Sequence, residues 1–292
     1  MNAATPSAVS PRKIKKLLVA NRSEIAIRVF RASAELGIRT VAIYADEDKL
    51  SLHRFKADEA YQVGKGMGPL EAYLSIPEVI RVATEAGVDA IHPGYGFLSE
   101  SPEFADACAE AGILFIGPSP DTMRKLGNKV AARNLAISVD VPVMPATDPL
   151  PDDPDKVREM AEQIGLPVML KASWGGGGRG MRVIRDLSKL AGEVKNAKRE
   201  AKSAFGKDDV YLEKLVERAR HVEVQILGDR HGNAVHLFER DCSVQRRHQK
   251  VIEEAPSPAV DEDLRARMSD AAVKAGEAIA YSGAGTVEFL ID

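Results

Sequence analysis

Residues 16–44, KLLVANRSEIAIRVFRASAELGIRTVAIY, decide the first part of the fold. Two short apolar runs, 16–21 and 39–44, are typical of strands, and the segment 23–37 between them has its apolar residues at mixed helical spacing. Ser23 is placed to cap that helix, because a hydroxyl at this position accepts a hydrogen bond from the first turn. A strand, a helix and a second strand at this spacing predict a parallel pair with a crossover helix.

The same alternation continues along the chain after this unit. The expected elements are a helix at 73–87, a strand at 90–93, a helix at 102–112, a strand at 114–117 and a helix at about 121–139. Alternation of this kind favours an α/β fold in which a parallel sheet is covered on both faces.

The second half of the chain has a different pattern. A loop rich in Asp and Pro, 148–155, leads into a compact piece with expected helices at 154–165 and 188–204 and strands at 168–172, 181–185 and 210–216. Residues 220–227, 233–240 and 286–292 alternate between apolar and polar, which predicts antiparallel strands with one polar face. A helix is expected at 261–281, with Gly283 as its stop signal.

Composition excludes several classes of protein. The chain has 292 residues, of which 45% are hydrophobic and 28% charged, and its net charge of −3 gives no support for nucleic-acid binding. No apolar run approaches the roughly 18 residues that suggest a membrane span. Cys108 and Cys242 form no metal pattern, so they fit a reducing cytoplasm, and Cys242 is expected to be an inert packed thiol.

The glycine-rich segment 171–181, KASWGGGGRGM, is the strongest local signal of chemistry. Glycine loses the most conformational entropy on ordering, and a run of it permits close backbone approach to a ligand. Backbone N–H groups in such a loop can surround phosphate oxygens, and Lys171 at the end of the preceding strand would add a point charge. The alternative is a flexible hairpin loop. The segment does not have the P-loop pattern.

Lys129, Glu213 and Lys214 are weaker candidates when they are taken alone. A single lysine such as Lys129 is usually a solvated surface charge. Glu213 and Lys214 end a predicted strand, where they would present backbone groups and an ammonium to an adenine edge. An ordinary surface ion pair explains these two residues equally well.

Residues 239–250, ERDCSVQRRHQK, form the richest polar cluster. Three positive side chains and His248 within five residues indicate an anion site for phosphate or bicarbonate, whereas the alternative is a basic surface ribbon. Strict strand alternation places Gln245 and His248 on opposite faces, so the chain must bend if both serve one site. Glu288 lies in an otherwise apolar strand, where a carboxylate needs a partner or a metal such as Mg²⁺.

These stretches together resemble the biotin carboxylase family of the ATP-grasp superfamily. The matching pieces are VANRSEIAIRV (19–29), HPGYGFLSE (92–100), LGNKVAAR (126–133), MLKASWGGGGRGMRV (169–183), EKLVERARHVEVQILGD (213–229), ERDCSVQRRHQKVIEEAP (239–256) and GAGTVEFLID (283–292). Ser23, Trp174 and the segment 46–64 are most similar to the N-terminal biotin carboxylase region of bacterial pyruvate carboxylases.

The resemblance implies a role for individual residues. The residues implied to bind ATP are Lys129, Lys171, Gly177, Gly178, Glu213, Lys214, Val216, His221 and His248. Gln245, His248 and Lys250 are implied to be catalytic, with Lys250 holding bicarbonate. Glu288 is implied to be a ligand of Mg²⁺ or Mn²⁺.

The resemblance also implies a reaction and a domain plan. Bicarbonate would attack ATP to give carboxyphosphate, which carboxylates biotin on a carrier domain absent here, as the first half of converting pyruvate to oxaloacetate. The implied parts are a flexible tail at 1–15, a Rossmann-like pre-ATP-grasp domain at 16–125, and an ATP-grasp domain at 126–292 with a lid subdomain at about 143–216. The ATP-grasp domain is expected to be incomplete and the chain inactive alone. The full-length protein is expected to be a cytoplasmic homo-oligomer.

Two other functions stay open at this point. One is the biotin carboxylase subunit of an acyl-CoA carboxylase, which has the same site and a different final acceptor. The other is a non-catalytic module that binds nucleotide or a protein partner.

Overall fold

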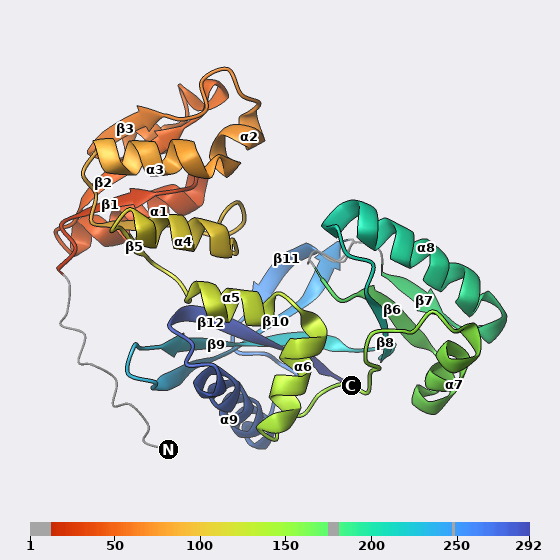
Figure 1. Cartoon of the computed structure of the whole chain (residues 1–292). Helices are drawn as coiled ribbons and strands as arrows, with labels where there is room; N and C mark the ends of the chain where they lie inside the picture. The colour runs from red at the N-terminus through yellow and green to blue at the C-terminus, as the bar shows by residue number, and fades with distance from the viewer. Residues whose placement is uncertain (1–12, 175–180, 247–248) are drawn as a thin grey trace, which may run out of the picture. The chain divides into compact units, whose positions relative to one another are not determined.

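The computed structural model describes residues 13–174, 181–246 and 249–292. The chain divides into two compact units, the first ending at Met123 and the second running from Arg124 to Asp292 (Figure 1). No helix among the described residues is both long and apolar enough to cross a lipid bilayer.

The first unit contains a five-stranded parallel sheet in the order β3-β2-β1-β4-β5. Its strands are β1 (Lys16–Val19), β2 (Arg39–Tyr44), β3 (Glu59–Gln62), β4 (Ala90–His92) and β5 (Leu114–Phe115). Its helices are α1 (Ser23–Glu35), α2 (Pro69–Leu74), α3 (Ile76–Glu85) and α4 (Pro102–Glu110), with short 3₁₀ turns at Asp46–Asp48 and Leu52–Phe55. The parallel sheet expected from the alternating pattern is therefore confirmed.

Apolar side chains on alternate positions of each strand fill two cores, one on each face of this sheet. Phe30 of α1 packs with Val19 and Ala42 on one face. Leu18 and Ile91 pack with the residues of α3 and α4 on the other. Both faces are covered, as a parallel sheet requires.

Two local predictions in the first unit are wrong. Ser23 does not cap α1: Arg22 occupies the N-cap position without a side-chain cap, and Ser23 itself has a φ of 57°. The helix expected at 73–87 is two helices, α2 and α3, separated at Ser75. Pro77 accounts for the break, because proline lacks an N–H and its ring clashes with the carbonyl four residues earlier.

The second unit begins with two helices where one was predicted at 121–139. Helix α5 (Pro120–Leu126) crosses from the first unit, and α6 (Lys129–Ser138) starts again after Gly127. Asn128 caps α6, since its Oδ1 accepts hydrogen bonds of 3.0 Å from both Val130 N and Ala131 N. The new helix start places Lys129 in the first turn of α6.

A small three-stranded antiparallel sheet, in the order β7-β6-β8, follows. It is made of β6 (Val168–Ala172), β7 (Arg182–Ile184) and β8 (Val210–Lys214), and α7 (Pro154–Ile164) and α8 (Leu187–Phe205) pack on it. This agrees with the compact piece expected from the sequence.

The last part of the chain is a four-stranded antiparallel sheet in the order β11-β10-β9-β12. Its strands are β9 (Arg220–Gly228), β10 (Ala234–Arg246), β11 (Gln249–Glu254) and β12 (Gly283–Ile291). Val222, Val224 and Ile226 pack on α9 (Glu262–Ala278), which lies along one face of the sheet (Figure 1). The residues that alternate with these three on β9, including His221 and Glu223, therefore face the opposite, polar side.

The polar cluster 239–250 forms the two arms of a hairpin, in which Gln245 pairs with Lys250 and Arg246 with Gln249. His248 lies outside the described residues, so a site shared by Gln245 and His248 stays a prediction. One expectation for the helix that covers this sheet is wrong. Helix α9 ends at Ala278, because Ala280 takes a φ of 47°, and Gly283 instead begins β12.

Candidate active site

A cavity of about 680 Å³ lies within the second unit and is called the site cavity below. It brings together five residues singled out from the sequence, which come from α6, β6, β8, β9 and β12: Lys129, Lys171, Glu213, His221 and Glu288. These residues are far apart along the chain, so only the fold assembles them.

Backbone contacts join the two lysines of the site cavity. The N–H of Lys129 donates to the carbonyl of Ser173 at 3.0 Å, and Asn128 forms an isolated bridge with Trp174. The start of α6 is therefore attached to the end of β6, which carries Lys171. Burial, followed by the positive charge of Lys171, lowers the pKa of Lys129. Two ammonium groups held this close together form a site suited to an anion, because a negative charge between them relieves their repulsion.

Glu213 on β8 faces the same two lysines. Its carboxylate accepts a short hydrogen bond from the ammonium of Lys171, and both side chains are largely buried. Tyr211, two residues earlier on the same strand, lines the cavity beside it. An ion pair shielded from water in this way is stronger than the surface pair considered from the sequence.

A continuous polar network connects four predicted residues on the strands β9, β10, β11 and β12. Glu288 contacts His221 (Oε2 to Nε2, 3.4 Å) and Lys250 (Oε1 to Nζ, 3.2 Å). Gln245 Nε2 donates to His221 Nδ1 at 2.7 Å, which leaves the proton of a neutral imidazole on Nε2, toward Glu288. The imidazole, the amide, the ammonium and the carboxylate are thus held in fixed positions relative to one another.

Glu223 and Arg240 belong to this network, and neither was singled out from the sequence. Glu223 is only 3% exposed and sits beside Glu288 in the β9–β12 register. Its carboxylate accepts from Arg240 Nε at 2.8 Å and from the Lys250 ammonium. Burial acts to raise the pKa of Glu223, but the hydrogen bonds from Lys250 and Arg240 outweigh it and hold the pKa below its usual value.

Lys250 therefore bridges two carboxylates, those of Glu223 and Glu288. Burial lowers its pKa, yet the hydrogen bonds to these acids prevail, so the pKa of Lys250 is raised and its charge is secure at neutral pH. The signal in the sequence was the polar face of β9, His221-Glu223-Gln225, opposite Arg240. It could be read only once the register of β9 and β10 was known.

Glu288 differs from its prediction in one respect. A buried carboxylate was expected, but the side chain is 54% exposed. The alternation of β12 places Glu288 on the polar face, while Val287 and Phe289 pack toward α9. Its exposure leaves carboxylate oxygen accessible to a ligand.

The other predicted residues either lie outside the site cavity or fall outside the described residues. The ammonium of Lys214 donates to the carbonyls of Gly165 and Leu166 at 2.8 and 3.1 Å, so it holds the α7–β6 turn rather than lining the cavity. Val216 follows the end of β8 and is likewise not one of the lining residues. Gly177, Gly178 and His248 lie outside the described residues.

Both thiols are buried, and neither has the surroundings of a nucleophile. Burial raises the pKa of Cys108 to about 12 and that of Cys242 to about 11. Ligand atoms of Cys242, Glu223 and Glu253 lie within 4.8 Å of one another. Arg240 and Lys250 already neutralise Glu223, and the protonated thiol is a poor ligand, so this cluster does not suit a cation. The inert role expected for Cys242 fits these values.

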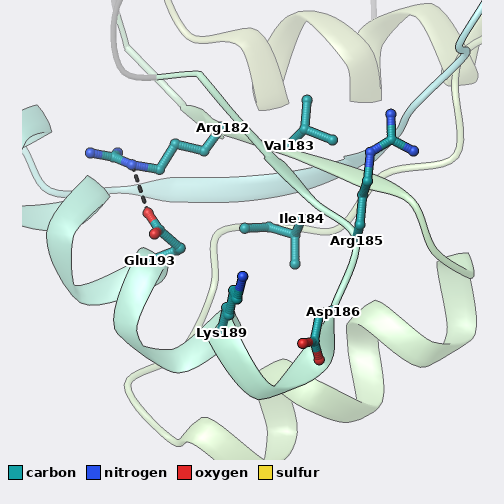
Figure 2. Close-up of a pocket in the computed structure, with 7 residues that line it drawn as sticks. All are labelled: Arg182, Val183, Ile184, Arg185, Asp186, Lys189 and Glu193. Atoms are coloured by element: carbon teal, nitrogen blue, oxygen red, sulfur yellow. Dashed lines mark ion pairs between the residues drawn. The ribbon is translucent and has the colours of Figure 1, made fainter.

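A second hollow, called the lid pocket below, lies between β7 and the start of α8 and has a volume of about 480 Å³ (Figure 2). Its arginines have acidic partners: Arg182 pairs with Glu193 at 2.8 Å, as Figure 2 shows, and Arg185 pairs with Glu217. Both arginines of the lid pocket are therefore compensated by acids, whereas Lys189, which also lines it, has no direct acidic partner among the described residues.

Comparisons with known proteins agree with this geometry. Residues 128–292 match the family described as the carbamoyl-phosphate synthase L chain, ATP binding domain, so the unit with the site cavity is of an ATP-binding class. Residues 13–123 match the biotin carboxylase N-terminal domain. The chain belongs to the biotin carboxylase family, as the two matches in this order indicate.

The relatives are longer proteins. The chain is 57% identical over 280 residues to a pyruvate carboxylase of Staphylococcus aureus and 54% identical over 281 residues to the mitochondrial pyruvate carboxylase of Mus musculus. Each alignment covers 96% of this chain and 24% of the relative. The chain thus spans about a quarter of the length of these relatives.

Solved structures give the same result. A Rhizobium etli pyruvate carboxylase with its allosteric activator acetyl coenzyme-A is 70% identical with a TM-score of 0.89, over 96% of this chain and 25% of that one. The biotin carboxylase domain of Hydrogenobacter thermophilus 2-oxoglutarate carboxylase, solved with MgADP, ADP and bicarbonate, is 46% identical with a TM-score of 0.91. That alignment covers 97% of this chain and 62% of the other.

Proposed function

We propose that this chain supplies the ATP- and bicarbonate-binding site for the carboxylation of biotin, which is the first half-reaction of a pyruvate carboxylase, and that the chain alone does not carboxylate biotin. One observation carries the proposal: Lys129 and Lys171 share a cavity with Glu288, which is joined to His221, Gln245 and Lys250 in one network. This arrangement can hold a triphosphate and a small oxyanion side by side.

Lys129 and Lys171 bind the nucleotide phosphates in this proposal. A fixed positive charge at the transferring phosphoryl group stabilises its transition state and requires little reorganisation during the reaction. The glycine run that follows Lys171 in the sequence supplies further backbone N–H groups, with Gly177 and Gly178 among them. Backbone groups from Glu213 to Val216 contact the adenine.

Lys250, Gln245 and His248 bind and orient bicarbonate. A bicarbonate oxygen attacks the γ-phosphorus of ATP, the bond to the ADP oxygen breaks, and carboxyphosphate and ADP form. Carboxyphosphate then separates into CO₂ and phosphate. The released phosphate takes the proton of a biotin ureido nitrogen, and that nitrogen bonds to the CO₂. Lys250 suits the binding step because two carboxylates maintain its charge, while His221 and Gln245 fix the neighbouring surface.

Glu288 is the residue that would hold Mg²⁺ or Mn²⁺. Its carboxylate oxygens are of the hard type that these ions prefer, and its side chain is half exposed toward the polar face of β12. A bound divalent ion would neutralise charge on the nucleotide phosphates. The 2-oxoglutarate carboxylase domain solved with MgADP supports an Mg²⁺-dependent nucleotide.

Pyruvate is the proposed final acceptor because the pyruvate carboxylases are the more similar relatives. Identities of 54–57% to those of mouse and Staphylococcus aureus compare with 44–46% to the biotin carboxylase of Campylobacter jejuni and the 2-oxoglutarate carboxylase domain. We place the N-terminal domain at 16–125, the ATP-grasp domain at 126–292 and the lid at 143–216. Cytoplasmic location and a homo-oligomeric full-length protein stay predictions.

The test is release of ADP from MgATP by the purified chain, with and without bicarbonate and free biotin. The proposal expects ADP release that requires bicarbonate, with Lys171→Met as the inactive control, and no ¹⁴C transfer from bicarbonate to biotin by the chain alone. Such transfer would contradict the inactivity of the isolated chain. Nucleotide binding with no effect of bicarbonate on ADP release would instead favour a non-catalytic nucleotide-binding module.

A further inference from the structure

Arg133 lies one helical turn beyond Lys129 on α6 and lines the site cavity with it. Side chains four residues apart share a helix face, so α6 presents two cations to the same space. Between and beyond them on this face are Ala132 and Ala136, whose small side chains leave that space open.

The guanidinium of Arg133 has two buried nitrogens, Nε and Nη1, that lack a hydrogen-bond partner in the structure of the described residues. Most buried polar groups in folded proteins are hydrogen-bonded, and charged ones are almost always paired. An unpartnered donor on a permanent cation is therefore unusual in the wall of a cavity. It is explained if a ligand supplies the acceptor.

The charges around the site cavity indicate what kind of acceptor is needed. Lys171 is paired with Glu213, and Glu288 is paired with Lys250 and also contacts the imidazole of His221. Within residues 13–174, 181–246 and 249–292, neither Lys129 nor Arg133 forms an ion pair with an acid. Two cations without a direct partner on one helix face call for an anion with at least two negative charges.

We propose that Arg133 is a second phosphate-binding residue of α6, which donates its fork of N–H groups to non-bridging phosphate oxygens of the bound nucleotide beside Lys129. This assignment rests on the proposed function, since it takes the nucleotide as the ligand of the cavity. The guanidinium matches phosphate because its parallel donors bind two oxygens at once. Tyr211 of β8 lines the site cavity together with Arg133.

The experiment compares binding of MgADP and of adenosine by calorimetry, because adenosine has the base and the ribose but no phosphate. In Arg133→Met, MgADP affinity is expected to fall 10- to 100-fold while adenosine affinity stays within twofold. Arg133→Lys is expected to lie between these values, since lysine keeps the charge and loses the fork. Arg158→Met, an exposed arginine in the i,i+4 pair with Glu162 on α7, is the matched control and should change neither affinity.

Several results would overturn the assignment. Equal weakening of MgADP and adenosine would show that Arg133 contacts the base or the ribose. An unchanged MgADP affinity, or a lower melting temperature with an unchanged ratio of the two affinities, would show a purely structural role. If the unmodified chain does not prefer MgADP to adenosine, the proposed function itself fails. If it does, and Lys129→Met loses the preference while Arg133→Met keeps it, only the assignment of Arg133 fails.

Discussion

The site cavity and the lid pocket are both lined by charged side chains, but they differ in whether their cationic side chains are paired with acids. In the lid pocket Arg182 and Arg185 are each paired with a glutamate of the same unit. In the site cavity Lys129 and Arg133 have no direct acidic partner among the described residues, and Lys129 is disfavoured in its charged form. The arginines of the lid pocket are thus compensated by acids, whereas two cations of the site cavity are left for a ligand.

The polar network that joins the site cavity at Glu288 contains one buried acid and one exposed acid. Glu223 is fully enclosed by its partners Arg240 and Lys250, whereas Glu288, its neighbour in register, is half exposed. The buried acid fixes Lys250 in position, and the exposed acid is available to a cation.

The largest effect is expected from removing the buried acid, in Glu223→Ala. Arg240 and Lys250 would be left without their carboxylate, which should lower the free energy of unfolding by about 3 kcal/mol, the low end for a broken buried pair, because both cations are 30% exposed. Urea denaturation measures the loss. Glu239→Ala is the control: Glu239 is equally buried and binds Arg265 through both oxygens, so stability should fall comparably. Only Glu223→Ala should also reduce bicarbonate-dependent ADP release, and equal retention in both variants would contradict the role of Lys250.

A smaller effect is expected from Lys129→Met, which removes an unmatched cation. A hydrogen bond to a charged group contributes roughly 1.5–3 kcal/mol, so MgADP affinity should fall about 30-fold. The folded chain loses no ion pair of Lys129, so its unfolding free energy should not decrease. Calorimetric titration and urea denaturation give the two values. Unchanged affinity would place the phosphates away from α6.

The pH dependence of MgADP affinity should be a few-fold effect. Burial and the charge of Lys171 lower the pKa of Lys129 in the free chain, and a bound phosphate would raise it again. At a pH between these two pKa values, Lys129 is neutral in the free chain and takes up a proton when MgADP binds. Affinity should therefore fall as the pH rises through the lowered pKa, before an ordinary lysine with a pKa near 10.4 would titrate. Titrations from pH 7 to 10 check this decline, which Lys129→Met should lack. An identical slope in both proteins would exclude Lys129 as its source.

The smallest effects are expected in the lid pocket. Arg185→Ala removes an exposed ion pair with Glu217, and such pairs contribute 0–1 kcal/mol. MgADP affinity should stay within twofold and the unfolding free energy within about 0.5 kcal/mol. A tenfold loss of MgADP affinity in this variant would remove the distinction between the two hollows.

Much of the fold could be predicted because its strands follow simple burial patterns. The parallel sheet of the first unit is read from apolar runs such as the one that contains Leu17 to Val19, and the apolar face of β9 from the alternation of Val222, Val224 and Ile226. Helix breaks were missed where one residue decides the geometry. Asn128 restarts a helix by capping it, and Pro77 prevents a helix from running through.

Some site residues could be predicted from the sequence and others could not, for a physical reason. Lys129, Lys171 and Glu288 stand out by their motifs, and the cavity brings them together. Glu223, Arg240 and Arg133 were not predicted as site residues. Their roles depend on the strand register and on contacts made in the folded chain, which a single sequence does not give. The exposure of Glu288 could not be predicted either, because it depends on which face of β12 packs against α9.

The central claim is that the site cavity holds a nucleotide by its phosphates. A crystal structure of the chain with MgADP tests it most directly. The account predicts the terminal phosphate within hydrogen-bond distance of the ammonium groups of Lys129 and Lys171, with the metal on Glu288. A nucleotide in the lid pocket, or one whose phosphates point away from both lysines, would contradict it.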